Sequence, residues 1–446
     1  MGRRISSVAR LRAALDALGD QIAAVDFGLP SADQQVRREL RDELGWMIRE
    51  YLIPRLADLD TDVVAVVVGS TGSGKSTLVN TLAQRPVSQT GPIRPTTKAP
   101  VIWCHEKHAQ RYRDTFMSGY GIDTDSGRSL RVVADTAPLL RGVTLIDAPD
   151  FDSVIGEHRE IVTELLAIAD ICIFVTSAQR YADAVPWEFL DRARRRKLPI
   201  VFVVNRLPDT GVSEILADYS GHLRRRDILQ GDPSIVEIRE QTIIPEYMGL
   251  TPGAVDGLRE RLAAFADPGR RYAVIVDTTK GAVEDVVARS GDLAAAIRQE
   301  AEEGAALIGF AKEAYFEQLD EIGRALDEDS LIRAEGGTRR KEFGASVARR
   351  LDLAASQTAA AWELDPAGRV LLGDAALWKR APEATGRIEE AIGAARRGLL
   401  ERLRDVFDAD EARFAGRVEA LLSGSTLGLR HATATVREAA EIFYGG

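Results

Sequence analysis

The chain has 446 residues, and 58 lysines and arginines against 68 aspartates and glutamates give it a net charge of −10. Hydrophobic residues make up 45% and charged residues 28%, a composition that excludes disorder as the main state. The acidic balance argues against a protein that mainly coats DNA or RNA, because phosphate binding needs a basic surface. We therefore expect two or three globular domains and no nucleic-acid partner.

The two cysteines, Cys104 and Cys172, are too few for a disulfide framework. Free thiols suit a reducing cytosol. No stretch approaches the roughly 18 consecutive apolar residues that a membrane-spanning helix needs. The sequence thus predicts a cytoplasmic protein, for which any contact with the inner face of the cell membrane is peripheral.

Three zones follow one another along the chain. Residues 1–60 carry apolar side chains at helical spacings and predict an N-terminal helical segment. Residues 61–268 contain continuous apolar runs separated by helical stretches, a pattern typical of a buried, mostly parallel sheet with helices on both faces. Residues 269–446 carry long amphipathic patterns and predict a C-terminal helical bundle or stalk. The apolar runs of the second zone are 63–68, 143–146, 171–175 and 200–204.

The strongest signal is the segment GSTGSGKST, which matches the phosphate-binding pattern GxxxxGK[ST] in full. An apolar run precedes it, and LVNTL begins a helix after it. Glycines let backbone N–H groups turn toward a polyphosphate, and the helix N-terminus adds a favourable dipole. Lys75 can reach the β- and γ-phosphates, and Ser76 can bind Mg²⁺. The predicted phosphate-binding residues are Gly69, Ser70, Thr71, Gly72, Ser73, Gly74, Lys75, Ser76 and Thr77.

Two further segments complete a predicted Mg²⁺ site. Asp147 ends an apolar run, at a position where an acidic residue can hold Mg²⁺ through water. A proline-rich segment before it contains Thr96 and Thr97, and a threonine hydroxyl there can join Mg²⁺ and sense the γ-phosphate. The residues do not show which threonine does so. The predicted catalytic residues are Lys75, Ser76, Thr96 and Thr97, and the predicted metal ligands are Ser76, Thr96, Thr97 and Asp147.

With these residues the chain resembles the GTPase domain of dynamin-like proteins, above all those of bacteria and especially actinobacteria. The shared features are Asn80 in GKSTLVN, the RPTT segment, the Asp-x-Pro turn at Asp147 and the Asn-Arg pair at 205–206. The resemblance covers about residues 55–250. It implies a three-layer P-loop GTPase domain, GTP and Mg²⁺ as cofactors, and GTP hydrolysis. It also implies a homo-oligomer or a related GTPase as partner, and often work on membranes.

Three positions near the phosphates depart from the family pattern. Thr71 and Gly72 replace the Gln-Ser that many dynamins carry. Asp150 stands where the DxxG motif has glycine. A carboxylate near the γ-phosphate is repulsive unless it points away or meets a cation. The resemblance therefore leaves the efficiency of hydrolysis open.

The base-reading motif is also altered. In the family pattern Asn/Thr-Lys-x-Asp, the carboxylate accepts hydrogen bonds from guanine. Here the predicted base-binding residues are Asn205, Arg206 and Asp209, and the acidic residue comes one place late, after a proline. Guanine selectivity is thus implied by the resemblance alone. Two alternatives stay open: a nucleotide-binding scaffold or switch with little hydrolysis, and an ATP-driven P-loop ATPase.

Overall fold

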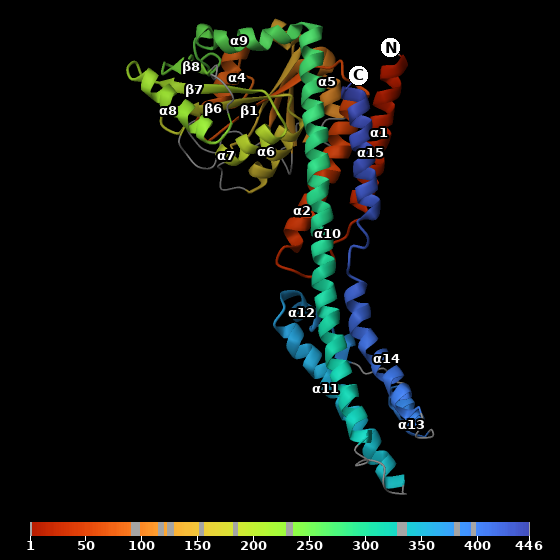
Figure 1. Ribbon diagram of the computed structural model, residues 1–446. Helices are drawn as coiled ribbons and strands as arrows, with labels where there is room; N and C mark the ends of the chain where they lie inside the picture. Colours follow the sequence, from red (N-terminus) through yellow and green to blue (C-terminus); the bar gives the residue numbers. More distant parts are fainter. Residues whose placement is uncertain are drawn as a thin grey trace. The chain divides into compact units, whose positions relative to one another are not determined.

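The computed structural model describes residues 2–90, 99–114, 120–122, 129–150, 156–181, 186–228, 235–327, 337–378, 384–393 and 398–445. It contains an eight-stranded sheet in the order β3-β4-β2-β5-β1-β6-β7-β8 (Figure 1). Neighbouring strands run parallel except β2 and β5, so the predicted α/β class with a mostly parallel sheet is confirmed. The strands are β1 (Val63–Gly69), β2 (Val101–His105), β3 (Gly121–Ile122), β4 (Ser129–Asp135), β5 (Val143–Asp147), β6 (Ile171–Ser177), β7 (Ile200–Leu207) and β8 (Val236–Arg239).

Helices make up most of the rest of the described chain. Up to the end of the sheet region they are α1 (Gly2–Ala23), α2 (Gln34–Trp46), a π-helix (Met47–Leu52), α3 (Ile53–Ala57), α4 (Lys75–Ala83), α5 (Glu106–Asp114), α6 (Gly156–Ile168), α7 (Pro186–Arg195), α8 (Val212–Arg225) and α9 (Asp256–Ala263). Beyond it they are α10 (Pro268–Asp327), α11 (Gly337–Glu363), α12 (Pro366–Leu371), α13 (Ala384–Gly393), α14 (Leu399–Glu419) and α15 (Leu427–Tyr444). The predicted helical region after the sheet is therefore present.

Contacts between residues divide the chain into two compact units. Unit 1 comprises residues 1–16, 46–288 and 435–446, and it contains the sheet. Unit 2 comprises residues 17–45 and 289–434 and is helical. The long helix α10 contributes its first part to unit 1 and the rest to unit 2. The three domains expected from the sequence stay a prediction.

The middle of the sheet is buried because helices cover both of its faces. β1 pairs with β5 and β6, and Val63, Ala65 and Val67 share one apolar core with Leu78 and Leu82 of α4. Figure 1 shows α4 and α9 on one face of the sheet and α6 and α7 on the other. A strand covered on both faces needs a continuous apolar run, which is the pattern that predicted β1, β5, β6 and β7.

The apolar runs do not predict the other four strands. β4 alternates buried residues with more exposed ones, and β8 has only four residues. β3 has two. Short or alternating strands such as these three leave a weak sequence signal, because fewer of their side chains enter the core.

A buried ion pair joins three elements of unit 1. Arg55 of α3 pairs with Asp170, the residue before β6, and the two side chains are 5% and 0% exposed. Asp170 also accepts hydrogen bonds from the Val64 N–H of β1 at 2.9 Å and from the Thr278 hydroxyl of α10 at 3.0 Å. This carboxylate therefore ties α3 and the first part of α10 to the sheet.

Unit 2 is built around a second apolar core, to which α10, α11, α12, α13 and α14 contribute. Within it the Trp362 indole N–H donates to the Leu307 carbonyl at 2.9 Å. The buried Glu300 accepts hydrogen bonds from the Leu29 N–H at 3.1 Å and the Ser423 N–H at 3.0 Å. These bonds hold the segment after α1 and the segment after α14 on α10.

Among the described residues, no helix is both long enough and apolar enough to pass through a bilayer.

Replacing Arg55 with alanine is expected to lower the free energy of unfolding of unit 1 by about 3–5 kcal/mol, because Asp170 stays buried without its cation. Urea unfolding followed by intrinsic fluorescence measures the loss. Arg10→Ala is the matched control, since it breaks an exposed ion pair with Glu438. The side chains of Arg10 and Glu438 are 51% and 62% exposed. The control should change the free energy by less than about 1 kcal/mol. Equal effects of the two substitutions would contradict the prediction.

Candidate nucleotide-binding site

The loop between β1 and α4 brings its backbone closer to neighbouring elements than a side chain would allow. A Cβ on Gly69 would lie 2.2 Å from the Val175 carbonyl oxygen of β6. Gly74 has a φ of +97°, and a Cβ there would lie 2.3 Å from the Asn205 amide nitrogen. Gly72 also has positive φ, at 76°. Glycine is therefore required at 69 and 74 by close approach and by backbone conformation.

Lys75 folds back onto this loop at the start of α4. Its ammonium group donates to the carbonyl oxygens of Gly69 at 2.8 Å and Ser70 at 3.3 Å. It also forms an ion pair with the carboxylate of Asp150, which follows β5. The Lys75 side chain is only 4% exposed. The loop thus holds a nearly buried positive charge beside the N-terminus of α4, where the helix dipole also favours anions.

Ser76 and Asp147 meet beside the lysine. The Ser76 hydroxyl donates to Asp147 Oδ2 at 2.6 Å. Asp147 is fully buried, and its Oδ1 has no hydrogen-bond partner among the described residues. Burial raises the pKa of Asp147, against the opposing effects of the Ser76 hydrogen bond and the Lys75 charge. A buried carboxylate oxygen without a donor, next to a hydroxyl, fits a hard cation such as Mg²⁺.

No group of three or more His, Cys, Asp or Glu residues gathers as a metal site in the described part of the chain. A cation held by Ser76 and Asp147 would therefore need further oxygen ligands that are not His, Cys, Asp or Glu side chains of the described residues. Hydroxyl, water and phosphate oxygens are the usual ligands of Mg²⁺ bound with a nucleotide. Thr96 and Thr97, predicted for this role, lie outside the described residues.

The three predicted base-binding residues lie at and after the end of β7. The Asn205 amide is buried and donates to the Ser73 carbonyl oxygen at 2.9 Å, so this side chain supports the phosphate loop. Arg206 has a positive φ of 55°. Asp209 is exposed, and its carbonyl oxygen accepts from the Arg239 guanidinium of β8 at 3.3 Å. Asn205 thus lies at the loop, whereas Asp209 lies in an exposed turn.

Two contacts of the loop's surroundings do not follow from the motif. Asn80, noted only as part of the family resemblance, is fully buried in α4. Its amide donates to the Ser88 carbonyl at 3.0 Å and accepts from the N–H groups of Val87 and Ser88 at 2.9 and 2.8 Å. It therefore holds the chain that leads toward residues 91–98. An asparagine inside the mostly apolar stretch LVNTL is the signal that could have revealed this role.

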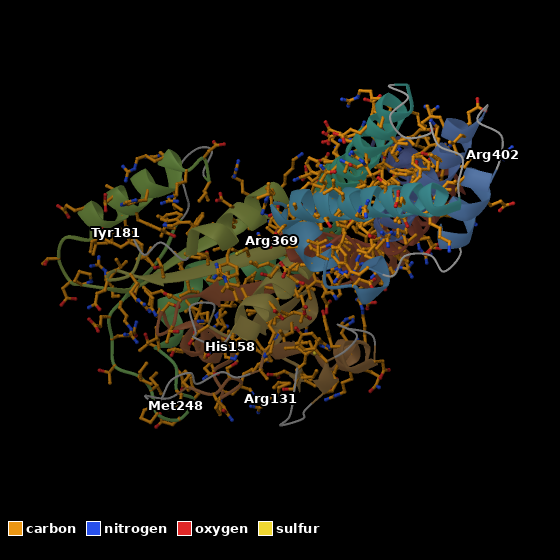
Figure 2. All side chains as sticks on the ribbon, turned by 90° about the horizontal axis from the view of Figure 1, so that it is seen from below. Arg131, His158, Tyr181, Met248, Arg369 and Arg402 are labelled. Atoms are coloured by element: carbon orange, nitrogen blue, oxygen red, sulfur yellow. The ribbon has the colours of Figure 1, made fainter. Side chains whose placement is uncertain are left out.

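The loop after β6 also reaches the phosphate loop. The Arg180 guanidinium donates to the Thr71 carbonyl oxygen at 2.6 Å. The next residue, Tyr181, is labelled in Figure 2, and its hydroxyl donates to Asp218 of α8 at 2.8 Å. The loop is thus anchored to α8 on one side while it supports residue 71 on the other.

Residues 64–206 match the protein family described as 50S ribosome-binding GTPase. They form a P-loop GTPase domain. A curated relative, described as a probable transmembrane GTPase FZO-like, chloroplastic, from Arabidopsis thaliana, is 27% identical over 158 residues. That match covers 35% of this chain and 16% of the relative, so the chain matches less than a fifth of the relative's length. The match supports the resemblance of the GTPase domain to dynamin-like P-loop GTPases.

Several solved structures are similar at low sequence identity. An oligomerised bacterial dynamin pair, described in connection with sensing and tethering of membranes, has a TM-score of 0.36 and 11% identity, with 97% of this chain and 93% of that chain covered. Era with MgGDPNP and 16S ribosomal RNA has a TM-score of 0.32 and 18% identity, with 46% and 57% covered. Toc33 from Arabidopsis thaliana with Mg²⁺ and GMPPNP has a TM-score of 0.31 and 15% identity, with 54% and 93% covered. No functional conclusion follows from likeness at this level.

Replacing Gly69 with alanine is expected to destabilise unit 1 by about 1–3 kcal/mol, because the new methyl group meets a backbone carbonyl that cannot move aside. The measurement is the melting temperature of the purified variant. Gly257→Ala serves as the control, since a Cβ at that position of α9 has no atom within 4 Å. Its melting temperature should equal or exceed that of the parent protein. A Gly69 variant as stable as the control would show that the loop backbone can shift.

Proposed function

We propose that the protein binds GTP with Mg²⁺ at residues 69–77, hydrolyses it, and couples the nucleotide state to self-association or membrane-associated work. The observation that carries this proposal is the arrangement around the loop. A nearly buried ammonium group, a helix N-terminus and the hydroxyl–carboxylate pair of Ser76 and Asp147 come together around the loop in unit 1. Cation, dipole and hydroxyl together suit a polyphosphate with its metal ion.

In this proposal the phosphates are held by the backbone N–H groups of residues 69–77 and by the charge of Lys75. Ser76 and Thr96 or Thr97 would hold Mg²⁺, and Asp147 would support it through water. Bound Mg²⁺ would neutralise charge on the phosphate oxygens. We propose that hydrolysis by water relies on positioning and electrostatics, because Lys75 and the loop place positive charge where the phosphoryl oxygens would lie.

Guanine recognition is proposed for Asn205, Arg206 and Asp209. Asp209 is exposed, and Arg239 holds the carbonyl oxygens of Pro208 and Asp209, which gives this turn a defined shape. An exposed carboxylate in a shaped turn can accept from a guanine base. The role of Asn205 would be indirect, through the phosphate loop. An ATP-driven enzyme is the alternative, and base preference separates the two.

A second candidate function is a nucleotide-dependent switch or scaffold with little turnover. The ion pair between Lys75 and Asp150 favours it, because it occupies the charge that hydrolysis needs. Measuring phosphate release at saturating GTP distinguishes the candidates. Tight GTP binding with no release above the uncatalysed rate would support the switch.

Self-association and membrane contact are proposed from the resemblance to dynamin-like proteins. The descriptions of a transmembrane GTPase and of a membrane-tethering dynamin pair belong to the two matched proteins themselves. For this chain we propose a cytoplasmic protein whose contact with the inner face of the membrane is peripheral, and a partner that is a second copy or a related GTPase.

Lys75→Ala is expected to weaken binding of a fluorescent GTP analogue in Mg²⁺ by about 10–100-fold, the equivalent of losing a charged hydrogen bond. Titrations with GTP and ATP analogues measure affinity and base preference together. Lys107→Ala removes the same charge from an exposed position of α5 and should leave binding unchanged. Unaltered binding by the Lys75 variant would contradict the proposal that this loop binds the nucleotide. Tighter binding of the ATP analogue would contradict the GTPase proposal and support the ATPase alternative.

Peripheral membrane contact predicts that the protein sediments with liposomes of anionic lipid, and more strongly with a GTP analogue present. Binding that relies on basic side chains should fall as salt rises from about 0.05 to 0.3 M, because screening weakens it. Neutral liposomes are the control. Protein left in the supernatant in every condition would exclude the membrane part of the proposal.

A further inference from the structure

Asp150 is the charged residue whose position is not explained by nucleotide binding. It stands where the resembled family has glycine, three residues after Asp147, and its side chain is only 14% exposed. Its carboxylate forms an ion pair with Lys75, the cation expected to hold the phosphates. The carboxylate that seemed repulsive in the sequence therefore meets a cation in the structure.

This contact uses up the donors of the lysine. An ammonium group has three N–H donors. Lys75 directs hydrogen bonds to the carbonyl oxygens of Gly69 and Ser70 and to Asp150. A phosphate oxygen can bind Lys75 only if one of these partners leaves. The two carbonyl oxygens belong to the loop itself, so Asp150 is the partner that can be exchanged.

The charges around Lys75 bear on how such an exchange would occur. Asp147 and Asp150 are two carboxylates close to one lysine, since Asp150 pairs with Lys75 and Asp147 accepts a hydrogen bond from the neighbouring Ser76. Phosphates would add further negative charge to the same space. Like charges in a poorly solvated region repel strongly. Asp150 must therefore move away from the phosphates or be neutralised when they bind.

We propose that Asp150 is a built-in competitor of the nucleotide. Its carboxylate occupies Lys75 in the free protein and is displaced by the phosphates, so that it lowers the affinity for nucleotides and does so more for a triphosphate than for a diphosphate. The inference rests on the proposed function, since it concerns nucleotide binding at the same loop. Asp150 acts through Lys75 and is a positioning residue.

The test compares Asp150→Asn and Asp150→Ala with the parent protein. Titration with fluorescent GTP and GDP analogues should show about tenfold tighter GTP binding in both variants, the equivalent of one charged contact no longer broken. The gain for GDP should be smaller. Asp60→Asn is the control, since it removes the same charge from an exposed residue before β1 and should change neither affinity. Circular dichroism and melting temperature establish that each variant is folded.

Two further arms separate competition from other roles. In the Lys75→Ala background, Asp150→Asn should give less than half of its gain, because no lysine is left to compete for. A full gain there would mean direct repulsion of phosphate and would overturn the proposal. Titrations repeated in EDTA test whether Asp150 is instead a Mg²⁺ ligand. Weaker GTP binding by the Asp150 variants only when Mg²⁺ is present would assign that role and overturn competition.

Unchanged affinity in the Asp150 variants, with binding still weakened in Lys75→Ala, would overturn the competitor and leave the proposed function intact. Binding that Lys75→Ala leaves unaltered would contradict the proposed function instead. The two failures are therefore distinguishable within one set of titrations.

Discussion

The ammonium group of Lys75 is the charge on which the candidate site depends. With its side chain 4% exposed, it has lost most of its hydration, and such a cation is stable only where carbonyl oxygens or anions surround it. The carbonyl groups of Gly69 and Ser70 provide part of this environment. The remaining place is open to an anion, and the structure fills it with Asp150. The position beside Lys75 that we propose for a phosphate oxygen is thus the position that the Asp150 carboxylate holds in this structure.

The register of the sheet brings the other groups to this charge. Asp147 lies opposite Val67 in the β5–β1 pairing, and Asn205 lies opposite Ser177 in the β7–β6 pairing. Parallel strands end at the same edge, so these two side chains reach Ser76 and Ser73 although they are distant in the chain. The approach is close enough that only glycine fits at positions 69 and 74. The loop, the Ser76–Asp147 hydrogen bond and the supporting Asn205 amide therefore depend on one sheet geometry.

Much of the fold could be predicted because its strongest signals are local. The strands β1, β5, β6 and β7 are continuous apolar runs, and the phosphate loop is a compact motif between a strand and a helix. The sequence does not predict β4 or β3, since β4 alternates and β3 is very short. The sequence predicts a base-binding role for Asn205, and the structure adds a contact of its amide with the Ser73 carbonyl oxygen. The sequence does not indicate which of two polar groups a side chain will hydrogen-bond when tertiary packing brings both groups close to it.

The sequence by itself determined which chemical groups are present: a glycine-rich loop, one lysine, a serine hydroxyl and the carboxylates after β5. These follow from residue identity and short spacing, and they predict a P-loop domain that binds a nucleotide. Only the tertiary structure decided which charges meet. Lys75 and Asp150 are 75 residues apart, and their contact exists because β1 and β5 are neighbours in the sheet. Since the energy between two charges depends on their distance and their burial, that pairing could be obtained only from the packed structure.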